Sequence, residues 1–227
     1  METAPEAQLL RSWDANAAAW TAAVRERAIP SRIAGTDQAI VDAVRELRSA
    51  RVLDVGCGEG WLARRLRTET GCEVTGIDGS APLIAAARTA DPDGSYWVLS
   101  YEAAIAQPAE LGGPYDLAVC NFALLGEPLA PLLGTLAGAL ARGGAILIQT
   151  LHPWAACGDQ PYRDGWREET FAGFGGGRWH PMPWYFRTLE SWLAESRTAG
   201  LVLAACREPR DPASGQPLSL LLQLARP

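Results

Sequence analysis

Three glycines at alternate positions directly follow a short apolar run, in the stretch "LDVGCGEGWL" at positions 53–62. Glycine costs roughly 0.5–1 kcal/mol relative to alanine inside a helix or strand, so Gly56, Gly58 and Gly60 indicate that another molecule comes close to the main chain. A glycine turn between a strand and a helix directs main-chain N–H groups toward such a ligand. The sequence therefore predicts a ligand site at this turn.

Two acidic residues narrow the chemistry of that ligand. Asp54 lies two positions before the first glycine, where its carboxylate would repel a pyrophosphate but attract an ammonium group. The spacing Gly-x-Gly-x-Gly also differs from the Gly-x-Gly-x-x-Gly of dinucleotide sites. Asp78 ends the next apolar run, and a carboxylate there can accept hydrogen bonds from both hydroxyls of a ribose, each worth about 1.5–3 kcal/mol.

The stretch "VLDVGCGEG" resembles motif I of the class I S-adenosylmethionine-dependent methyltransferases, and the resemblance extends over about residues 51–150. It implies S-adenosylmethionine as the cofactor and S-adenosylhomocysteine as the product. By this likeness the glycines pack against the methionine part, Asp54 organises the amino-acid end and Asp78 binds the ribose. The cofactor-binding residues that we expect are Trp20, Arg32, Asp54, Gly56, Cys57, Gly58, Gly60, Asp78, Gly79, Ser80, Ser100, Tyr101, Glu102, Asn121 and Phe122.

One part of the chain departs from the family pattern. Where the family places an acid that reads the adenine amino group, this chain has Ser100-Tyr101-Glu102. Either Glu102 or a main-chain carbonyl would take that part. Tyr101 would either stack on the base or only pack against the fold, since both are common for a tyrosine after a strand.

Two further likenesses concern the reacting group and the cover of the cofactor. "YDLAVCNFALL" resembles motif IV, which would bring Asn121 and Phe122 near the transferred methyl group. Trp20 and Arg32 would close over the cofactor, with Arg32 either pairing with the methionine carboxylate or standing as a surface charge. The segment is not of the Asn-Pro-Pro-Tyr type that acts on nucleic-acid bases.

An aromatic-rich insertion follows the fifth expected strand, over residues 151–187. Five of the nine tryptophans lie between positions 154 and 192. Because ligands of such sheets bind outside the carboxyl ends of the strands, the insertion is placed to act as a lid over an apolar or aromatic substrate. The alternative is that its rings form a small core of their own. The substrate-binding residues that we expect are Trp154, Trp184, Tyr185 and Arg187.

Both histidines of the chain, His152 and His180, lie in this insertion. Imidazole titrates near neutral pH, so either one could deprotonate a hydroxyl or amine nucleophile. A histidine that precedes proline, as both do, could instead satisfy main-chain groups. With two histidines and no acidic cluster after the fourth or fifth strand, we expect no metal ion.

Alternating strand and helix patterns must position these residues. Strands are expected over 51–56, 72–78, 95–99, 115–120, 143–150, 201–208 and 217–225, and helices over 5–29, from 36, and over 61–69, 80–90, 129–141 and 188–199. This order predicts an α/β fold, a doubly wound, mainly parallel sheet. The resemblance implies seven strands in a Rossmann-like arrangement, with the last strand antiparallel.

We expect a single domain with four parts. Residues 1–48 form N-terminal helices over the cofactor, and residues 51–150 form the cofactor-binding core. Residues 151–187 form the substrate lid, and residues 188–227 form a C-terminal helix and a strand hairpin.

Composition bounds the partners of this 227-residue chain. A net charge of −6 and a pI of about 5.0 argue against nucleic acid or an anionic membrane as a partner. No apolar run approaches the roughly 20 residues of a membrane span, the start lacks a secretory signal, and the five cysteines are scattered. We therefore expect a cytoplasmic protein, monomeric or homodimeric.

The expected function is metal-independent methyl transfer from S-adenosylmethionine to a small molecule. Two alternatives stay open at this point. One is a NAD(P)-dependent oxidoreductase, which the glycine spacing disfavours, and the other is a non-catalytic module that binds S-adenosylmethionine.

Overall fold

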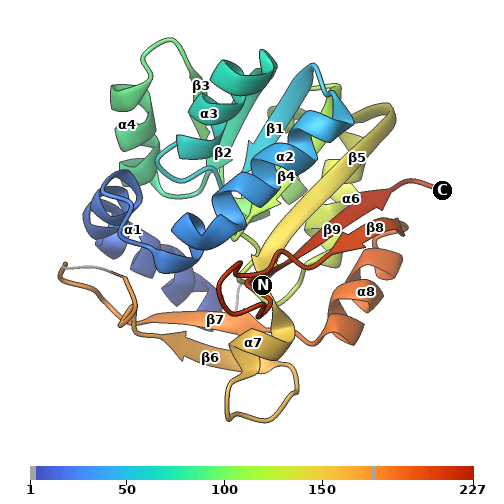
Figure 1. The fold of residues 1–227 in the computed structure, drawn as a ribbon. Coiled ribbons are helices and arrows are strands. Elements are labelled where there is room, and N and C mark those ends of the chain that lie inside the picture. The colour runs from blue at the N-terminus through green and yellow to red at the C-terminus, as the bar shows by residue number, and fades with distance from the viewer. Residues whose placement is uncertain (1–3, 175–176) are drawn as a thin grey trace.

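A seven-stranded sheet forms the centre of the computed structural model, which describes residues 4–174 and 177–227 (Figure 1). The strands are β1 (Arg51–Val55), β2 (Glu73–Asp78), β3 (Ser95–Val98), β4 (Tyr115–Asn121), β5 (Leu140–Leu151), β8 (Val202–Arg207) and β9 (Ser219–Ala225). They lie in the order β3-β2-β1-β4-β5-β9-β8. The first five run parallel, and β9 runs antiparallel to both β5 and β8. The prediction of a doubly wound, mainly parallel seven-stranded sheet is confirmed.

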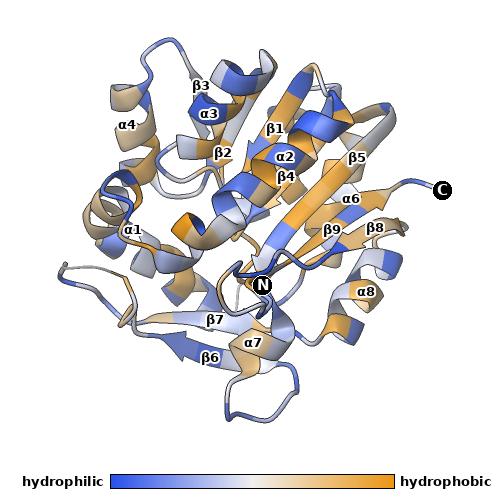
Figure 2. Ribbon diagram, viewed as in Figure 1, coloured by the Kyte–Doolittle hydropathy of each residue, from blue (hydrophilic) through white to orange (hydrophobic). Residues whose placement is uncertain are grey.

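One face of the sheet is covered by α2 (Asp37–Leu47), α3 (Trp61–Thr70) and α4 (Ala81–Ala90). Their apolar stripes pack on alternate residues of the strands, such as Val52 of β1 and Val119 of β4. This alternation follows from the two-residue period of a strand. Figure 2 shows the same division, with hydrophobic strands between helices of mixed character.

The opposite face is covered by α6 (Ala130–Gly138) and α8 (Leu189–Thr198), together with the short α5 (Tyr101–Ala106). These helices pack on the intervening strand residues, among them Leu53 of β1 and Ile148 of β5. Two helices have side-chain caps, because Ser100 accepts from the amide of Ala103 and Thr188 from that of Ser191.

The N-terminal helix α1 (Ala4–Arg25) and a two-stranded hairpin lie beyond the carboxyl ends of the parallel strands (Figure 1). The hairpin consists of β6 (Gly165–Glu169) and β7 (Met182–Phe186), and α7 (Pro153–Cys157) connects it to β5. Helix α1 packs against both β7 and α4. Residues 1–3 of the expected N-terminal segment and 175–176 of the expected lid lie outside the described residues.

Several boundaries differ from those predicted. The helix expected over 129–141 ends at Gly138, because residues 140–142 already belong to β5. The first helix ends at Arg25 rather than at position 29, and a π-type segment, η1 (Arg32–Thr36), precedes α2. A 3-10 turn, η2 (Pro108–Leu111), precedes β4. Within the two described ranges, no helix is both long enough and apolar enough to cross a membrane.

Candidate functional site

The glycine turn after β1 adopts a backbone that side chains rarely permit. Gly56, Gly58 and Gly60 have φ angles of 69°, 56° and 80°. A Cβ on Gly56 would lie 2.5 Å from the Cβ of Ala123, and one on Gly60 would lie 2.9 Å from the ring of Tyr96. The absence of a side chain at Gly56 thus leaves room for the loop after β4. The absence of one at Gly60 lets the start of α3 pack closely against Tyr96. Among the described residues, only the Trp20 indole nitrogen lies within 4 Å of the Cβ position of Gly58, at 3.6 Å, so this is the least crowded part of the turn.

Asp78 organises the edge of the turn. Its Oδ2 accepts from the amide of Gly58 at 2.9 Å, and its Oδ1 accepts from the amide of Ser80 at 2.8 Å. Burial raises the pKa of Asp78, and these two amides act against that rise. The carboxylate lines the cavity described below, so its remaining lone pairs are available to a ligand.

Asp54 lies in β1 beneath the turn and is 1% exposed. Its Oδ2 is buried without a hydrogen-bond partner among the described residues. Burial and, to a smaller extent, the nearby Asp78 raise the pKa of Asp54 to about 7, while the main-chain N–H of Ala63 acts against the rise. A buried carboxyl with an unpartnered oxygen favours a ligand that brings positive charge close to it.

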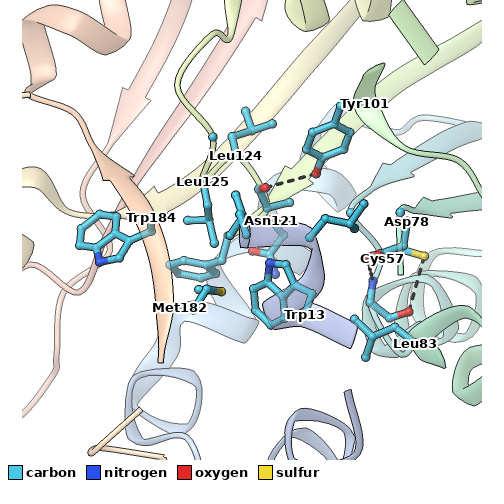
Figure 3. Close-up of a pocket in the computed structure, with 18 of the residues that line it drawn as sticks. Trp13, Cys57, Asp78, Leu83, Tyr101, Asn121, Leu124, Leu125, Met182 and Trp184 are labelled. Carbon is cyan, nitrogen blue, oxygen red and sulfur yellow. Dashed lines mark hydrogen bonds between the residues drawn. The ribbon is translucent and has the colours of Figure 1, made fainter. Parts of the chain in front are cut away.

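A cavity of about 390 Å³ opens above the turn and extends to the hairpin (Figure 3). Its walls come from α1, the glycine turn, the ends of β2 and β4, α5 and the hairpin. The predicted residues that line it are Trp20, Arg32, Gly56, Cys57, Gly58, Asp78, Gly79, Ser100, Tyr101, Glu102, Asn121, Phe122 and Trp184. The sequence-based prediction for the cofactor and substrate sites thus falls largely in one space.

Most other lining residues are apolar. They include Leu9, Leu10, Trp13, Leu83, Leu125, Leu129, Phe171, Phe174 and Met182. Trp13 contacts Trp20 edge-on, with ring centroids 5.2 Å apart, and also contacts Phe171, at 6.5 Å. Helix α1 and the segment between β6 and β7 therefore share one aromatic cluster at the cavity wall.

The sequence analysis did not single out Phe171, Met182 or Trp13 as site residues. The apolar stripe of the first helix carried a signal for Trp13, because a stripe unused by the core needs another surface to cover. The sequence carries little information about the positions of Phe171 and Met182, since these depend on the register of β6 against β7. That register pairs Glu169 with Met182 and so brings two distant segments to the same wall.

Three predicted cofactor residues, Asp54, Gly60 and Ser80, are not among those that line the cavity, and the last two have structural partners. Gly60 packs against Tyr96, as described above. The hydroxyl of Ser80 donates to Asp14 Oδ1 of α1 at 2.7 Å, which fastens α1 to the start of α4. Ser100 lines the cavity, yet its hydroxyl oxygen accepts from the amide of Ala103 as the N-cap of α5. This helix was not predicted.

Arg32 lies at the cavity wall and is not a free surface charge. Its Nε donates to Asp37 Oδ1 at 2.8 Å, and its guanidinium stacks over the ring of Trp61 at 4.2 Å. Its side chain is 12% exposed. The remaining guanidinium N–H groups can serve a carboxylate ligand.

The structure places neither histidine among the residues that line the cavity. The imidazole Nε2 of His152 contacts Glu208 Oε1 at 2.9 Å, and its Nδ1 is buried without a partner among the described residues. The side chain of His180 is exposed, and its main-chain groups bond to Asn16 of α1. The contacts of His180 therefore fit a structural role for its main chain better than the role of a general base.

Three of the four expected substrate residues are also displaced from the main cavity. Trp154 is 71% exposed. Tyr185 packs edge-on against Trp166, at 5.5 Å between ring centroids. Arg187 is buried and donates through Nη2 to the carbonyls of Gly126 and Glu127. Burial lowers the pKa of Arg187 to about 10. Trp184 is the exception and lines the cavity.

The loop after β4, residues 122–128, is held by several parts of the fold. The amide of Phe122 donates to the carbonyl of Gln149 at 2.7 Å, and Phe122 takes a φ of 52°, which is uncommon outside glycine. Tyr101 Oη donates to the carbonyl of Ala123, and the amide of Tyr185 donates to that of Leu125. This loop forms the wall between the glycine turn and the hairpin.

Comparison with known proteins agrees with this geometry. Residues 52–144 match the family model described as "Methyltransferase domain". The chain is 36% identical over 121 residues to a malonyl-[acyl-carrier protein] O-methyltransferase of Enterobacter lignolyticus, covering 53% of this chain and 45% of that protein. It is 36% identical over 112 residues to a ubiquinone biosynthesis O-methyltransferase of Xanthomonas campestris, covering 47% and 45%. The chain thus spans about half the length of these curated relatives.

Solved structures show the same fold. An S-adenosylmethionine-dependent methyltransferase from Mesorhizobium loti is 25% identical with a TM-score of 0.60, and the alignment covers 82% of this chain and 96% of that one. A structure from Listeria monocytogenes, described as a putative enzyme of the same kind, is 20% identical with a TM-score of 0.66 over 86% and 98%. Residues 52–144 thus match a methyltransferase domain, and the chain has the fold of the class I S-adenosylmethionine-dependent methyltransferases.

Proposed function

We propose that the protein transfers a methyl group from S-adenosylmethionine to an oxygen, nitrogen or carbon atom of a small, largely apolar molecule, without a metal ion. One observation carries the proposal: the glycine turn and Asp78 line one apolar cavity, and Asp54, with one unpartnered carboxyl oxygen, is buried beneath that turn. The match to a methyltransferase domain and the O-methyltransferases among the relatives support it.

The residues present fit this cofactor. Asp78 would accept from the ribose hydroxyls, and the uncrowded face at Gly58 would admit the methionine part close to the main chain. The positive charge of its ammonium group would compensate Asp54, directly or through water, and Arg32 would pair with its carboxylate. When bound, the cofactor supplies an electrophilic methyl group on a positively charged sulfur.

The protein's own residues supply orientation and an apolar enclosure. Aligning a nucleophile with an electrophile can account for roughly 7–11 kcal/mol of the barrier, whereas a general base contributes only about 10²–10⁴-fold. Trp13, Phe171 and Met182 would hold the acceptor and exclude water, while Asn121 stands where the two halves of the cavity meet. Neither histidine is part of this proposal.

The remaining features of the proposal concern its setting. All five cysteines are free thiols, which supports a reducing, cytoplasmic location. Among the residues that the structure describes, no group of three or more histidine, cysteine and acidic side chains is arranged to hold a metal ion. The acidic net charge supports a small-molecule partner rather than a nucleic acid, and the protein would act as a monomer or homodimer.

Calorimetric titration tests the cofactor, and a labelled-methyl screen tests the reaction. We expect S-adenosylmethionine and S-adenosylhomocysteine to bind, and NAD(P)H not to bind. The screen would supply labelled S-adenosylmethionine with phenols, quinols, acids and amines. Binding of NAD(P)H alone would favour the oxidoreductase alternative, and binding without transfer to any acceptor would favour a non-catalytic module.

A further inference from the structure

Two side-chain amides are joined in a row behind the cavity, at the carboxyl ends of β4 and β5. Gln149 of β5 is 1% exposed. Its Nε2 donates to the main-chain oxygen of Thr36 at 2.9 Å and to Asn121 Oδ1 at 3.2 Å. Asn121 and Gln149 are also paired in register across the two strands.

This row determines which way each amide faces. The main-chain oxygen of Thr36 can only accept a hydrogen bond, so the Gln149 atom that faces it must be the nitrogen. The same nitrogen faces Asn121, so Asn121 must present its oxygen there. A reversed Gln149 would set two oxygens against each other. The orientation of Asn121 thus follows from a main-chain carbonyl rather than from an arbitrary assignment.

Asn121 therefore keeps Nδ2 as a donor on its other side. Within residues 4–174 and 177–227, this nitrogen has no hydrogen-bond partner and is not among the buried, unpartnered side-chain atoms. Asn121 lines the cavity. Figure 3 shows it between the glycine-turn side, with Cys57 and Asp78, and the hairpin side, with Met182 and Trp184. Its free donor faces the space where the two halves of the cavity meet.

The arrangement is costly to the fold. Gln149 Oε1 and Thr36 Oγ1 are both buried without a partner among the described residues, and unsatisfied groups of this kind are uncommon in native proteins. An aliphatic side chain at position 149 would avoid an orphaned oxygen in the apolar layer between β4 and β9. The presence of glutamine there indicates a role other than packing.

We propose that Gln149 is a positioning residue that aims the Nδ2 of Asn121 at the methyl acceptor, and that the acceptor atom is the oxygen of a hydroxyl group. This inference rests on the proposed function and narrows its substrate class. A hydroxyl oxygen has two lone pairs, so one can accept from Asn121 while the other attacks. A neutral amine has a single lone pair, which attack consumes.

The step balances without another reactant. The acceptor oxygen forms a bond to the methyl carbon, the bond between that carbon and sulfur breaks, and its electron pair stays on the sulfur. The hydroxyl proton leaves to solvent, so one proton is released for each methyl group transferred.

A matched pair of probes, 1-naphthol and 1-aminonaphthalene, tests the inference in protein saturated with S-adenosylhomocysteine. Calorimetry should show that 1-naphthol binds about fivefold to tenfold more tightly, as expected for one neutral hydrogen bond, because the lone pair of the aromatic amine is delocalised into its ring and accepts poorly from Asn121. Gln149→Met should bring this ratio close to one and leave S-adenosylhomocysteine affinity unchanged. Gln149→Glu presents an acceptor to Asn121 and turns Nδ2 inward, so that Oδ1 faces the methyl acceptor and either probe can donate to it; the ratio should again fall close to one.

A double-variant cycle separates positioning from a general structural effect. Gln149→Met should have no further effect on the ratio in an Asn121→Leu background. Ser219→Ala, which removes another buried hydroxyl without a partner among the described residues, at the start of β9, should leave the ratio unchanged. An unchanged ratio in both Gln149 variants, equal binding of the two probes, or binding of neither would overturn the inference. Failure of S-adenosylhomocysteine to bind the unaltered protein would instead overturn the proposed function.

Discussion

Asn16 pairs through its side-chain amide with both main-chain groups of His180. Its Nδ2 donates to the His180 carbonyl at 2.9 Å, and its Oδ1 accepts from the His180 amide at 2.8 Å. Asn16 is fully buried in α1, whereas His180 lies two residues before the start of β7. The pairing imitates one rung of a sheet and fastens the hairpin to the helix that covers the cavity.

Replacing Asn16 with alanine should loosen the hairpin without unfolding the core. Both hydrogen bonds are lost, at about 1 kcal/mol each, and water can reach the exposed His180. We expect faster amide hydrogen exchange over residues 165–186 and weaker acceptor binding. Thr89→Ala, which removes a hydrogen bond within α4, is the control. Exchange confined to α1 would contradict this account of the hairpin.

Replacing Asp78 with asparagine should weaken cofactor binding. Both oxygens of Asp78 accept main-chain amides, so an asparagine must set its NH₂ group against one of them and loses the charge offered to a ribose. We expect a loss of about 10–100-fold in S-adenosylhomocysteine affinity, measured by calorimetry. Asp91→Asn removes a comparable carboxylate that pairs with Arg67 and Tyr96 away from the cavity. Equal affinity losses in both variants would show that the Asp78 effect is only structural.

Replacing Asp54 with asparagine should make the ligand-free protein more stable at high pH. The pKa of Asp54 is raised from 3.8 to about 7 by burial, so the folded state holds a proton that the unfolded state releases. The stability of the unaltered protein therefore falls as pH rises from about 4 to 7, by about 4 kcal/mol if this group acts alone. Asparagine does not titrate, so above pH 7 the variant does not show this loss of stability.

Chemical denaturation at several pH values checks this expectation. The two proteins should have similar free energies of unfolding at pH 4, and the variant should be the more stable at pH 8. Its affinity for S-adenosylhomocysteine should fall, because the group meant to face the ligand's ammonium has lost its charge. A constant difference in stability across the pH range would contradict the assignment of the raised pKa.

The core of the site could be predicted because it depends on local sequence. A strand, three glycines and a helix lie within a short stretch, and the acid at position 78 follows from the end of the next strand. Chain connectivity then brings both to the carboxyl edge of the sheet. Sequence periodicity is enough to place Gly58 and Asp78 on one wall of the cavity.

The lid could not be predicted residue by residue for a different reason. Whether a side chain of the hairpin faces the cavity is decided by its register, since a shift of one residue exchanges the two faces. Trp184 and Tyr185 are neighbours, and only Trp184 lines the main cavity. The role of Ser100 could not be predicted either, because its hydroxyl oxygen caps α5 and the sequence analysis did not predict that helix.

Replacing Arg187 with lysine should disturb acceptor binding while sparing the cofactor. Nη2 of the guanidinium donates to the carbonyls of Gly126 and Glu127 in the loop after β4. The planar group also lies over the rings of Tyr185 and Trp192, and a lysine ammonium does not reproduce that stacking. We expect a loss of about 3 kcal/mol in stability and a several-fold higher KM for the acceptor. Arg167→Lys is the matched control, because Arg167 lies on β6 and binds the carbonyls of Ala156 and Pro161 instead. Similar acceptor KM values in both variants would contradict a role in shaping the cavity wall.

Replacing either histidine with glutamine should leave methyl transfer nearly unchanged. A general base in contact with the acceptor would contribute about 10²–10⁴-fold, but His152 faces Glu208 and the His180 side chain is exposed. Glutamine can keep a donor toward Glu208, so His152→Gln should also fold. We expect kcat/KM within about threefold of the unaltered protein and the same dependence on pH, measured by labelled-methyl transfer. A hundredfold loss in one variant, with cofactor affinity intact, would mean that this histidine reaches the acceptor after all.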